Sequence, residues 1–131
     1  GLAAPQVHEG LRLFVAMLDE EPDAKSAAHV LINPQITSLS DAKDEGWEGC
    51  LSIPDIRGMV PRHVDISVSA LDRSGKVFDL RLKNFPARVV QHETDHLDGV
   101  LFFDRMDSME TLTFLDEFAK YWSKGEDEDE D

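Results

Sequence analysis

Two histidines and a glutamate in the second half of the chain have types and a spacing suited to metal chemistry. His92 and His96 are four residues apart, so on an α-helix both imidazoles lie on one face, one turn apart. Glu93 is turned by about 100° from His92 and can reach a water on the same metal without being a ligand. In this H-E-x-x-H arrangement the metal makes hydroxide available near neutral pH, and the glutamate handles its proton.

A catalytic metal site usually takes three protein ligands and leaves one position open. Besides a carboxylate, the candidates for the third ligand are Cys50, His8, His29 and His63. Cys50 lies in a glycine-containing segment that predicts a loop where a thiolate can approach a metal closely. By itself, a lone cysteine is more typical of a small buried apolar residue. We interpret the other three histidines as surface or satisfied polar residues.

The motif requires a helix with one side against the core. Pro86 suits the first turn of a helix and Gly99 suits its end, so we expect a helix over residues 86–98. A surface helix that carries two histidines is the alternative interpretation. Apolar residues flank the motif, however, and place part of the helix against the core: Val89, Val90, Leu97 and Val100. Ionisable groups in such a place need partners, and a metal is a sufficient one.

Strand patterns precede this helix. Residues 11–17 and 30–34 are typical of buried strands, and we expect Pro34 to stop the second because proline cannot donate to a sheet. Residues 64–70 and 76–82 predict a hairpin around a turn. A last helix is expected from Asp107, with an apolar stripe at helical spacing: Met109, Leu112, Leu115, Phe118, Ala119 and Trp122. Strands first and helices later favour an α+β fold.

Length and charge limit the possible functions. The 131 residues suit one domain, and 13 basic against 27 acidic residues give a net charge of −14, which argues against binding DNA or RNA. Residues 126–131 are all acidic, so we predict a domain over 1–124 and an acidic disordered tail over 125–131. The chain shows no membrane-spanning stretch and no signal peptide, and it has one cysteine. These features predict a cytoplasmic protein that acts at no membrane.

Three separated motifs resemble the peptide deformylase family. Residues 1–6 (GLAAPQ) are similar to the end of the family's first motif, residues 48–52 (EGCLS) match the second, and residues 91–96 (QHETDH) are similar to the third. The similarity covers most of residues 1 to about 115. The resemblance implies an α+β fold in which antiparallel sheets pack around the metal-binding helix.

The resemblance also implies a metal and a reaction. One divalent metal would be held by Cys50, His92 and His96, with water in the fourth position. The ion is usually Fe²⁺ in this family, and Ni²⁺ or Zn²⁺ can replace it; a thiolate with two imidazoles suits these ions better than magnesium or calcium. The implied reaction removes the formyl group from N-formylmethionyl nascent polypeptides and releases formate. Glu93 would take the proton of the water and pass it to the leaving amine.

Substrate contacts follow from the same resemblance. Gln6 and the backbone N–H of Leu51 would stabilise the oxyanion on the formyl oxygen. Backbone groups of Gly1, Gly46 and Gly49 would bind the peptide in an extended form. The methionine pocket would be lined, beside His92, by Glu48, Arg57, Arg88 and Val89. Further expectations are a Glu48–Arg57 pair at the pocket mouth, and a brace between Asp95 and Arg62 that fixes the helix.

The chain departs from the family pattern in three places. The first motif lacks its initial glycine and the segment that normally precedes it, which predicts an N-terminally incomplete domain. Thr94 stands where the family prefers an apolar residue, although its methyl group can still pack. The C-terminal segment is acidic, so we expect no docking on the ribosome through a basic helix, while contact through another surface stays open.

Two other functions share part of this residue set. A metallopeptidase would use the same metal and Glu93, but it has no use for the motifs that contain Gln6 and Cys50. An inactive copy would bind formyl peptides or nothing, yet all the residues expected to do chemistry are present. Metal content and formate release separate the three functions.

Overall fold

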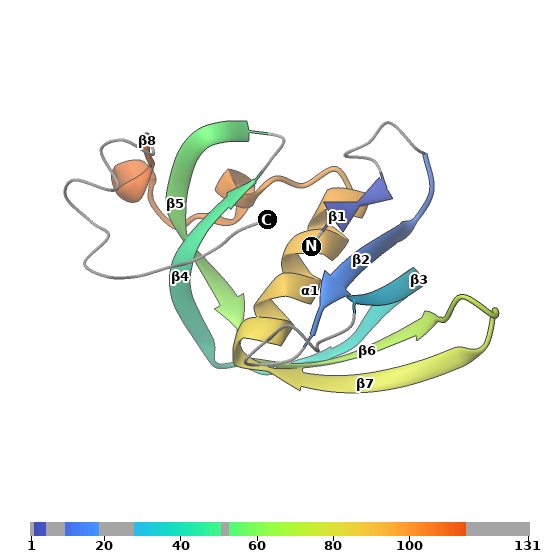
Figure 1. Cartoon of the computed structure of the whole chain (residues 1–131). Helices are drawn as coiled ribbons and strands as arrows, with labels where there is room; N and C mark the ends of the chain where they lie inside the picture. Colours follow the sequence, from blue (N-terminus) through green and yellow to red (C-terminus); the bar gives the residue numbers. More distant parts are fainter. Residues whose placement is uncertain (1, 5–9, 19–27, 51–52, 115–131) are drawn as a thin grey trace.

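Two antiparallel sheets lie on either side of one helix in the computed structural model, which describes residues 2–4, 10–18, 28–50 and 53–114 (Figure 1). For residues 2, 50 and 53–55 the backbone alone is described. The larger sheet has the order β1 (Leu2–Ala3), β2 (Leu13–Met17), β3 (Ala28–Leu39), β6 (Asp65–Leu71) and β7 (Val77–Lys83). The smaller sheet has the order β4 (Lys43–Cys50), β5 (Ile53–His63) and β8 (Thr113–Phe114). This arrangement confirms the expected α+β class.

The helix α1 (Asn84–Leu97) carries the H-E-x-x-H motif and confirms the predicted helix, which begins two residues earlier than expected. Its end is well defined. Gly99 has a positive φ of 77°, a conformation that glycine adopts without strain. The N–H groups of Gly99 and Val100 then donate to the carbonyls of His96 and Asp95 at 3.2 and 2.8 Å. These two bonds satisfy carbonyls of the last turn, so the turn that holds His96 is closed.

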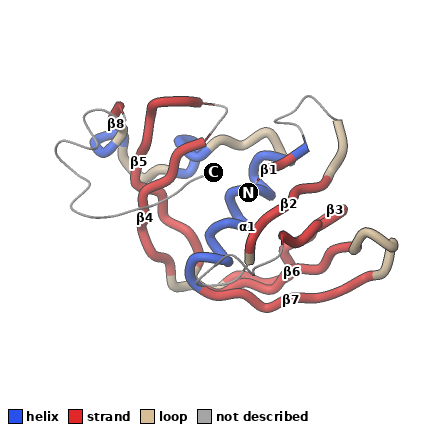
Figure 2. The backbone as a smooth tube through the Cα atoms, viewed as in Figure 1, coloured by secondary structure: helices blue, strands red, loops and turns tan. Residues whose placement is uncertain are grey.

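One side of α1 packs against the larger sheet, as Figure 2 makes visible. Apolar residues of the helix and the sheet form one buried cluster, which includes Phe14, Leu31, Ile66, Ala87 and Val90. A second, smaller cluster joins β5 to a 3₁₀ turn (Phe102–Arg105), with Val60 and Phe102 at its centre. The helix is therefore held between the two sheets by apolar contacts with the first and, as described below, by charges against the second.

The predicted hairpin is confirmed, and it forms β6 and β7. The two strands pair from Asp65 opposite Lys83 to Leu71 opposite Val77. Within the turn, a carboxylate oxygen of Asp72 accepts bonds from the N–H groups of Ser74 and Lys76 at 2.8 and 3.0 Å. The side chain thus closes the turn, which is the reason that aspartate favours this position.

Pro34 does not end its strand, contrary to the sequence prediction. Strand β3 continues to Leu39, and its register against β6 shifts between Ile32 and Gln35. The proline lies within this irregularity, where the sheet needs no donor from it. The N–H of Asn33, just before it, bonds to the carbonyl of Arg12 at 2.8 Å.

The segment around Cys50 is a strand and not the loop that its glycines predicted. Strand β4 pairs with β5 along its length, from Lys43 opposite His63 to Gly49 opposite Arg57, with a register shift before Cys50. Glycine and proline are rare in strands, so the composition of β4 and β5 argued against this pairing. Ionic contacts with Arg88 and Asp95 of α1, which lie far away in the sequence, support the pairing.

The predicted C-terminal helix does not begin where its cap pattern placed it. Met109–Thr111 form a single 3₁₀ turn, and the Oγ of Ser108 caps it by accepting from the N–H of Glu110 at 3.1 Å. The next residues, Thr113–Phe114, form β8 and pair with β5. Backbone pairing with an existing sheet replaces the helical bonds here. The rest of the apolar stripe, and the predicted boundary at 124/125, lie outside the described residues.

None of the helices in the described ranges combines the length and the apolar character that crossing a membrane requires.

Candidate metal centre and its ionic support

His92 and His96 direct a ring nitrogen toward each other across one turn of α1. Their Nε2 atoms are 3.1 Å apart, and both side chains are buried. The Nδ1 of His92 is 2.9 Å from the Oε1 of Glu48 on β4. An ionised carboxylate only accepts hydrogen bonds, so the proton of the neutral ring is on Nδ1. The Nε2 of His92 therefore keeps its lone pair and points at His96.

This geometry suits a shared metal ion. Two nitrogen ligands at 2.0–2.1 Å from a tetrahedral zinc lie roughly 3.3 Å apart, close to the 3.1 Å between the two Nε2 atoms. A carboxylate on the far nitrogen of a ligand histidine is the usual support of such a ring. The described side chains form no group of three metal ligands. The side chain of the third predicted ligand, Cys50, lies outside the described residues.

Glu93 is 1% exposed, next to His92 on α1. An ionised carboxylate is costly to bury, and such a position is tolerated where the group has a specific task or partner. The adjacent position in the sequence puts Glu93 beside the histidine pair without making it part of the pair. The site therefore combines two nitrogens of the kind that bind metals with a buried carboxyl group.

Glu48 is the centre of the charges that surround the histidines. It is 5% exposed and accepts from three side chains, those of His92, Arg62 and Arg88. Arg62 donates from Nε and Nη2 at 3.0 and 2.9 Å, and Arg88 donates from Nη1 at 2.6 Å. The predicted pair between Glu48 and Arg57 is therefore wrong, because both oxygens of Glu48 accept from other donors.

These partners keep Glu48 ionised. Burial by itself raises the pKa of this carboxyl, but hydrogen bonds from His92 and Arg62 and the charge of Arg62 outweigh it and lower the pKa from 4.5 to about 2. The carboxylate thus remains charged at neutral pH and can accept from the Nδ1 of His92.

A pH-dependent stability follows for the metal-free protein. Because the folded pKa of Glu48 is below its ordinary value, its stabilising contribution is complete above about pH 5 and is lost as the pH falls toward 2. A shift from 4.5 to about 2 corresponds to about 3 kcal/mol. The free energy of unfolding, measured in urea between pH 3 and 7, should therefore change less steeply with pH for Glu48→Gln than for the wild type. Glu45→Gln, an exposed change on the same strand, is the control, and equal slopes for all three proteins would contradict the prediction.

The expected brace between Arg62 and Asp95 is present. Arg62 is 4% exposed, and its Nη1 donates to the Oδ2 of Asp95 at 2.6 Å. Burial lowers the pKa of Arg62, but its bonds to Glu48 and the charge of Asp95 raise it overall, so the guanidinium stays charged. Arg62 therefore joins β5 to β4 and to α1 at once.

Arg88 joins the helix to the smaller sheet in the same way. Besides Glu48, it donates to the carbonyls of Val60 and Asp44 at 2.9 and 2.7 Å. Its guanidinium lies over Gly46, where an added Cβ would be 3.0 Å from the Cζ of Arg88. A side chain at position 46 would therefore require the guanidinium of Arg88 to shift.

The other predicted substrate residues are spread around this centre. Gly49 and Arg57 face each other across β4 and β5, and Val89 packs against the core of the larger sheet. The remaining three predicted residues, Gly1, Gln6 and Leu51, lie outside the described residues. The structure thus brings together His92, His96, Glu93 and Glu48, and it places Arg88 beside them.

The comparisons with known proteins agree with this arrangement. The profile of the polypeptide deformylase family matches residues 1–112. Peptide deformylase 2 of Nostoc sp. is 48% identical over 118 residues, which cover 86% of this chain and 66% of that protein. The chain belongs to the peptide deformylase family.

Solved deformylases share the fold. Peptide deformylase 1B of Arabidopsis thaliana superimposes with a TM-score of 0.76 at 41% identity, over 91% of this chain and 63% of that one. A class I type b deformylase of Acinetobacter baumannii, solved with Met-Ala-Ser bound, superimposes with a TM-score of 0.72 at 39% identity, over 80% of this chain and 69% of that one. The chain thus spans about two thirds of the length of these relatives. Deformylases are metal-dependent, in keeping with the histidine pair.

Thr94, the departure from the deformylase motif, is buried, and its Oγ1 has no hydrogen-bond partner among the residues that the structure describes. A buried hydroxyl without a partner costs stability, and valine has nearly the same shape. Thr94→Val is therefore expected to raise the free energy of unfolding by about 1 kcal/mol. Thr111→Val should do the opposite, because the Oγ1 of Thr111 accepts from the N–H of Met59 at 2.9 Å. Chemical denaturation of both variants tests this, and a loss of stability in Thr94→Val would contradict it.

Two parts of the site had no counterpart in the sequence analysis. The acceptor for His92 was missed because Glu48 lies 44 residues away and was assigned to the pocket. Arg105 was also missed; it donates to both oxygens of Asp95. The motif spacing carries no information on either contact.

Proposed function

We propose that this chain removes the formyl group from N-formylmethionyl polypeptides and releases formate. The observation that carries the proposal is the pair of Nε2 atoms of His92 and His96, 3.1 Å apart, beside the buried Glu93. Membership of the deformylase family supports it. The Acinetobacter relative was solved with Met-Ala-Ser, which is the peptide left when formyl-Met-Ala-Ser loses its formyl group.

The proposed metal ligands are His92, His96 and Cys50, and the proposed ion is Fe²⁺, with Ni²⁺ or Zn²⁺ as substitutes. Two imidazoles and a thiolate are a donor set that suits these ions. When bound, the metal polarises the formyl carbonyl and activates the attacking water. Glu48 keeps the ring of His92 in the tautomer that offers Nε2, through its bond to Nδ1.

Glu93 is proposed as the proton carrier. Its carboxylate takes a proton from the water that attacks the formyl carbon, and it later gives this proton to the amine nitrogen as the C–N bond breaks. Formate and a free methionyl amine are the products. Gln6 and the backbone N–H of Leu51, both outside the described residues, are proposed to donate to the oxygen that becomes negative in this step.

The proposed peptide site uses backbone groups of Gly1, Gly46 and Gly49, with Arg57 and Val89 in the methionine pocket. The charged ends of Glu48 and Arg88 bond to each other, so these residues would contribute only the apolar parts of their side chains to the pocket. A neutral pocket of this kind suits the uncharged thioether of methionine.

Formate release tests the proposal. The chain is purified without oxygen, loaded with Ni²⁺ and incubated with formyl-Met-Ala-Ser, and both formate and formyl-methionine are measured. We expect stoichiometric formate with intact Met-Ala-Ser, and no reaction with acetyl-Met-Ala-Ser. Release of formyl-methionine and Ala-Ser without formate would instead indicate a metallopeptidase. A folded, metal-loaded protein that releases neither product would indicate a chain that only binds such peptides or is inactive.

A further inference from the structure

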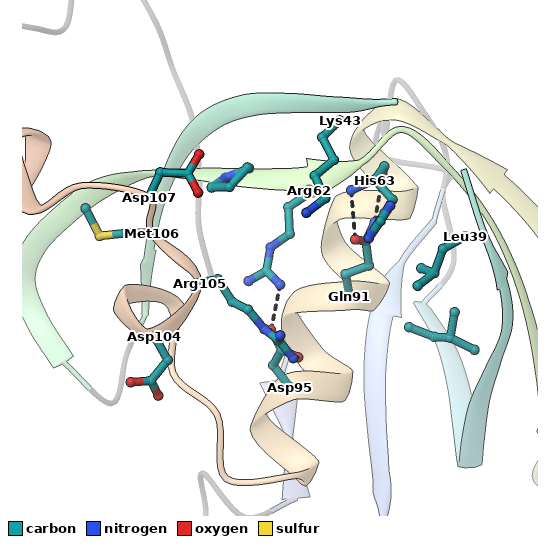
Figure 3. Close-up of a pocket in the computed structure, with 12 residues that line it drawn as sticks. Leu39, Lys43, Arg62, His63, Gln91, Asp95, Asp104, Arg105, Met106 and Asp107 are labelled. Carbon is teal, nitrogen blue, oxygen red and sulfur yellow. Dashed lines mark hydrogen bonds and ion pairs between the residues drawn. The ribbon is translucent and has the colours of Figure 1, made fainter. Parts of the chain in front are cut away.

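Arg105 is a half-exposed residue outside the motifs that nevertheless contacts the metal-binding helix. It ends the 3₁₀ turn after α1 and is 51% exposed. Its Nε and Nη2 donate to the Oδ2 and Oδ1 of Asp95 at 3.1 and 2.9 Å. Figure 3 shows Arg105 beside Asp95 at the wall of a pocket of about 400 Å³ on the side of α1 that carries Gln91 and Asp95. His92, Glu93 and His96 do not line this pocket.

Further hydrogen bonds connect this contact to the histidine pair. Asp95 is held from its other side by Arg62 at 2.6 Å. Arg62 donates twice to Glu48, and Glu48 accepts from the Nδ1 of His92. Arg105 is therefore the outer end of a series of charge-assisted hydrogen bonds, and the ring of His92 is its inner end. Such bonds are short and directional, so each member fixes the orientation of the next.

The position of Asp95 makes this series of hydrogen bonds important for His96. Asp95 directly precedes His96, and both lie in the last turn of α1, which ends at Leu97. The backbone of this turn is closed by the bonds that the carbonyls of Asp95 and His96 accept from Val100 and Gly99. Arg62 and Arg105 add side-chain bonds that hold the Asp95 carboxylate from two sides.

We propose that Arg105 is a positioning residue that acts through Asp95 to keep the Nε2 of His96 opposite the Nε2 of His92. The proposal rests on the proposed metal ligation by these two histidines. The planar guanidinium is required, because only its fork reaches both oxygens of Asp95 at once. Lysine would keep the charge and lose the second bond.

The chain contains a matched control for this contact. On β7, Arg81 donates from Nε and Nη2 to the two oxygens of Asp65 at 3.1 and 2.9 Å. Arg81 is 71% exposed and lies on an edge strand of the larger sheet. The two arginine–aspartate pairs have the same distances, but they differ in the exposure of the aspartate side chain, 10% for Asp95 and 24% for Asp65, and in what the aspartate is attached to.

The test measures Co²⁺ affinity and the visible spectrum of the Co²⁺ protein for the wild type, Arg105→Met, Arg105→Lys and Arg81→Met. Loss of a residue that orients a metal ligand typically weakens affinity by about 10- to 100-fold. For Arg105→Met we expect this loss of Co²⁺ affinity and an altered d–d band. Arg105→Lys should recover part of the wild-type affinity and spectrum, and Arg81→Met should match the wild type in both. The thermal midpoints of the metal-free variants are measured alongside, because the Asp95 side chain is only 10% exposed and any loss of stability must be separated from the loss of metal affinity.

Two outcomes overturn the proposal in different ways. If the wild type binds Co²⁺ and releases formate, while Arg105→Met matches Arg81→Met in affinity and spectrum, Arg105 has no positioning role and the proposed function stands. If the wild type itself binds no Co²⁺, the proposed metal ligation fails, and the role of Arg105 fails with it.

Discussion

Replacing Glu93 by glutamine is expected to reduce kcat/KM for formate release by roughly 10²- to 10⁴-fold, the usual contribution of a positioned acid–base group. Glutamine has the same shape as glutamate and cannot take a proton from water at neutral pH. Because Glu93 is 1% exposed, no solvent-exposed group can easily replace it. The loss should appear mainly in kcat, since the amide leaves the space for the peptide unchanged.

The measurement is steady-state formate release from formyl-Met-Ala-Ser, together with the metal content of each protein. The metal content should remain that of the wild type, because Glu93 is proposed as a proton carrier and not as a ligand. Glu45→Gln makes the same chemical change at an exposed position of β4 and should keep full activity. A Glu93→Gln protein within tenfold of the wild type, with metal bound, would show that another group carries the proton.

Replacing Arg62 by methionine is expected to cost about 3–5 kcal/mol of stability, the usual effect of breaking a buried ion pair from one side. Arg62 is 4% exposed, and it contacts Glu48 twice and Asp95 once. Its removal leaves two buried carboxylates with fewer donors. The contacts that join β5 to β4 and α1 are lost at the same time.

Urea unfolding of the metal-free protein measures this effect. Arg81→Met is the control, because it removes an arginine from an exposed pair and should cost under about 1 kcal/mol. Arg62→Lys keeps the charge without the planar fork, so its free energy of unfolding should lie between those of Arg62→Met and Arg81→Met. It also provides a folded sample if Arg62→Met is too unstable to purify. Equal stabilities of Arg62→Met and Arg81→Met would refute a central role for this ion cluster.

The larger sheet and the helix were predictable because their patterns are local. The β6–β7 hairpin follows from alternation and an aspartate turn, and α1 follows from Pro86, the motif and Gly99. Each of these features depends on residues within one turn or one strand pair of each other. Pro34 shows the limit of such rules, since the bulge that accommodates it depends on pairing with β6.

The smaller sheet was not predictable in the same way. Its strands β4 and β5 contain glycines and prolines that oppose strand formation when considered alone. Ion pairs support their pairing, because Glu48 on β4 bonds to Arg62 on β5 and to Arg88 on α1. Likewise, the apolar stripe after Asp107 suits a helix, but Met109 lies in a 3₁₀ turn and the neighbouring Thr113–Phe114 pair with β5. Tertiary contacts overrule weak local preferences in both cases.

The amino-acid sequence alone determined that two histidines and a glutamate share a helix, and its three motifs determined the family. Only the tertiary structure decided which charges support the histidines. With 13 basic and 27 acidic side chains, a great many ion pairs are possible, and residues as distant as Glu48 and His92 meet only once the two sheets have closed on α1. Spacing along a helix is set by its geometry, whereas pairing between elements is set by packing.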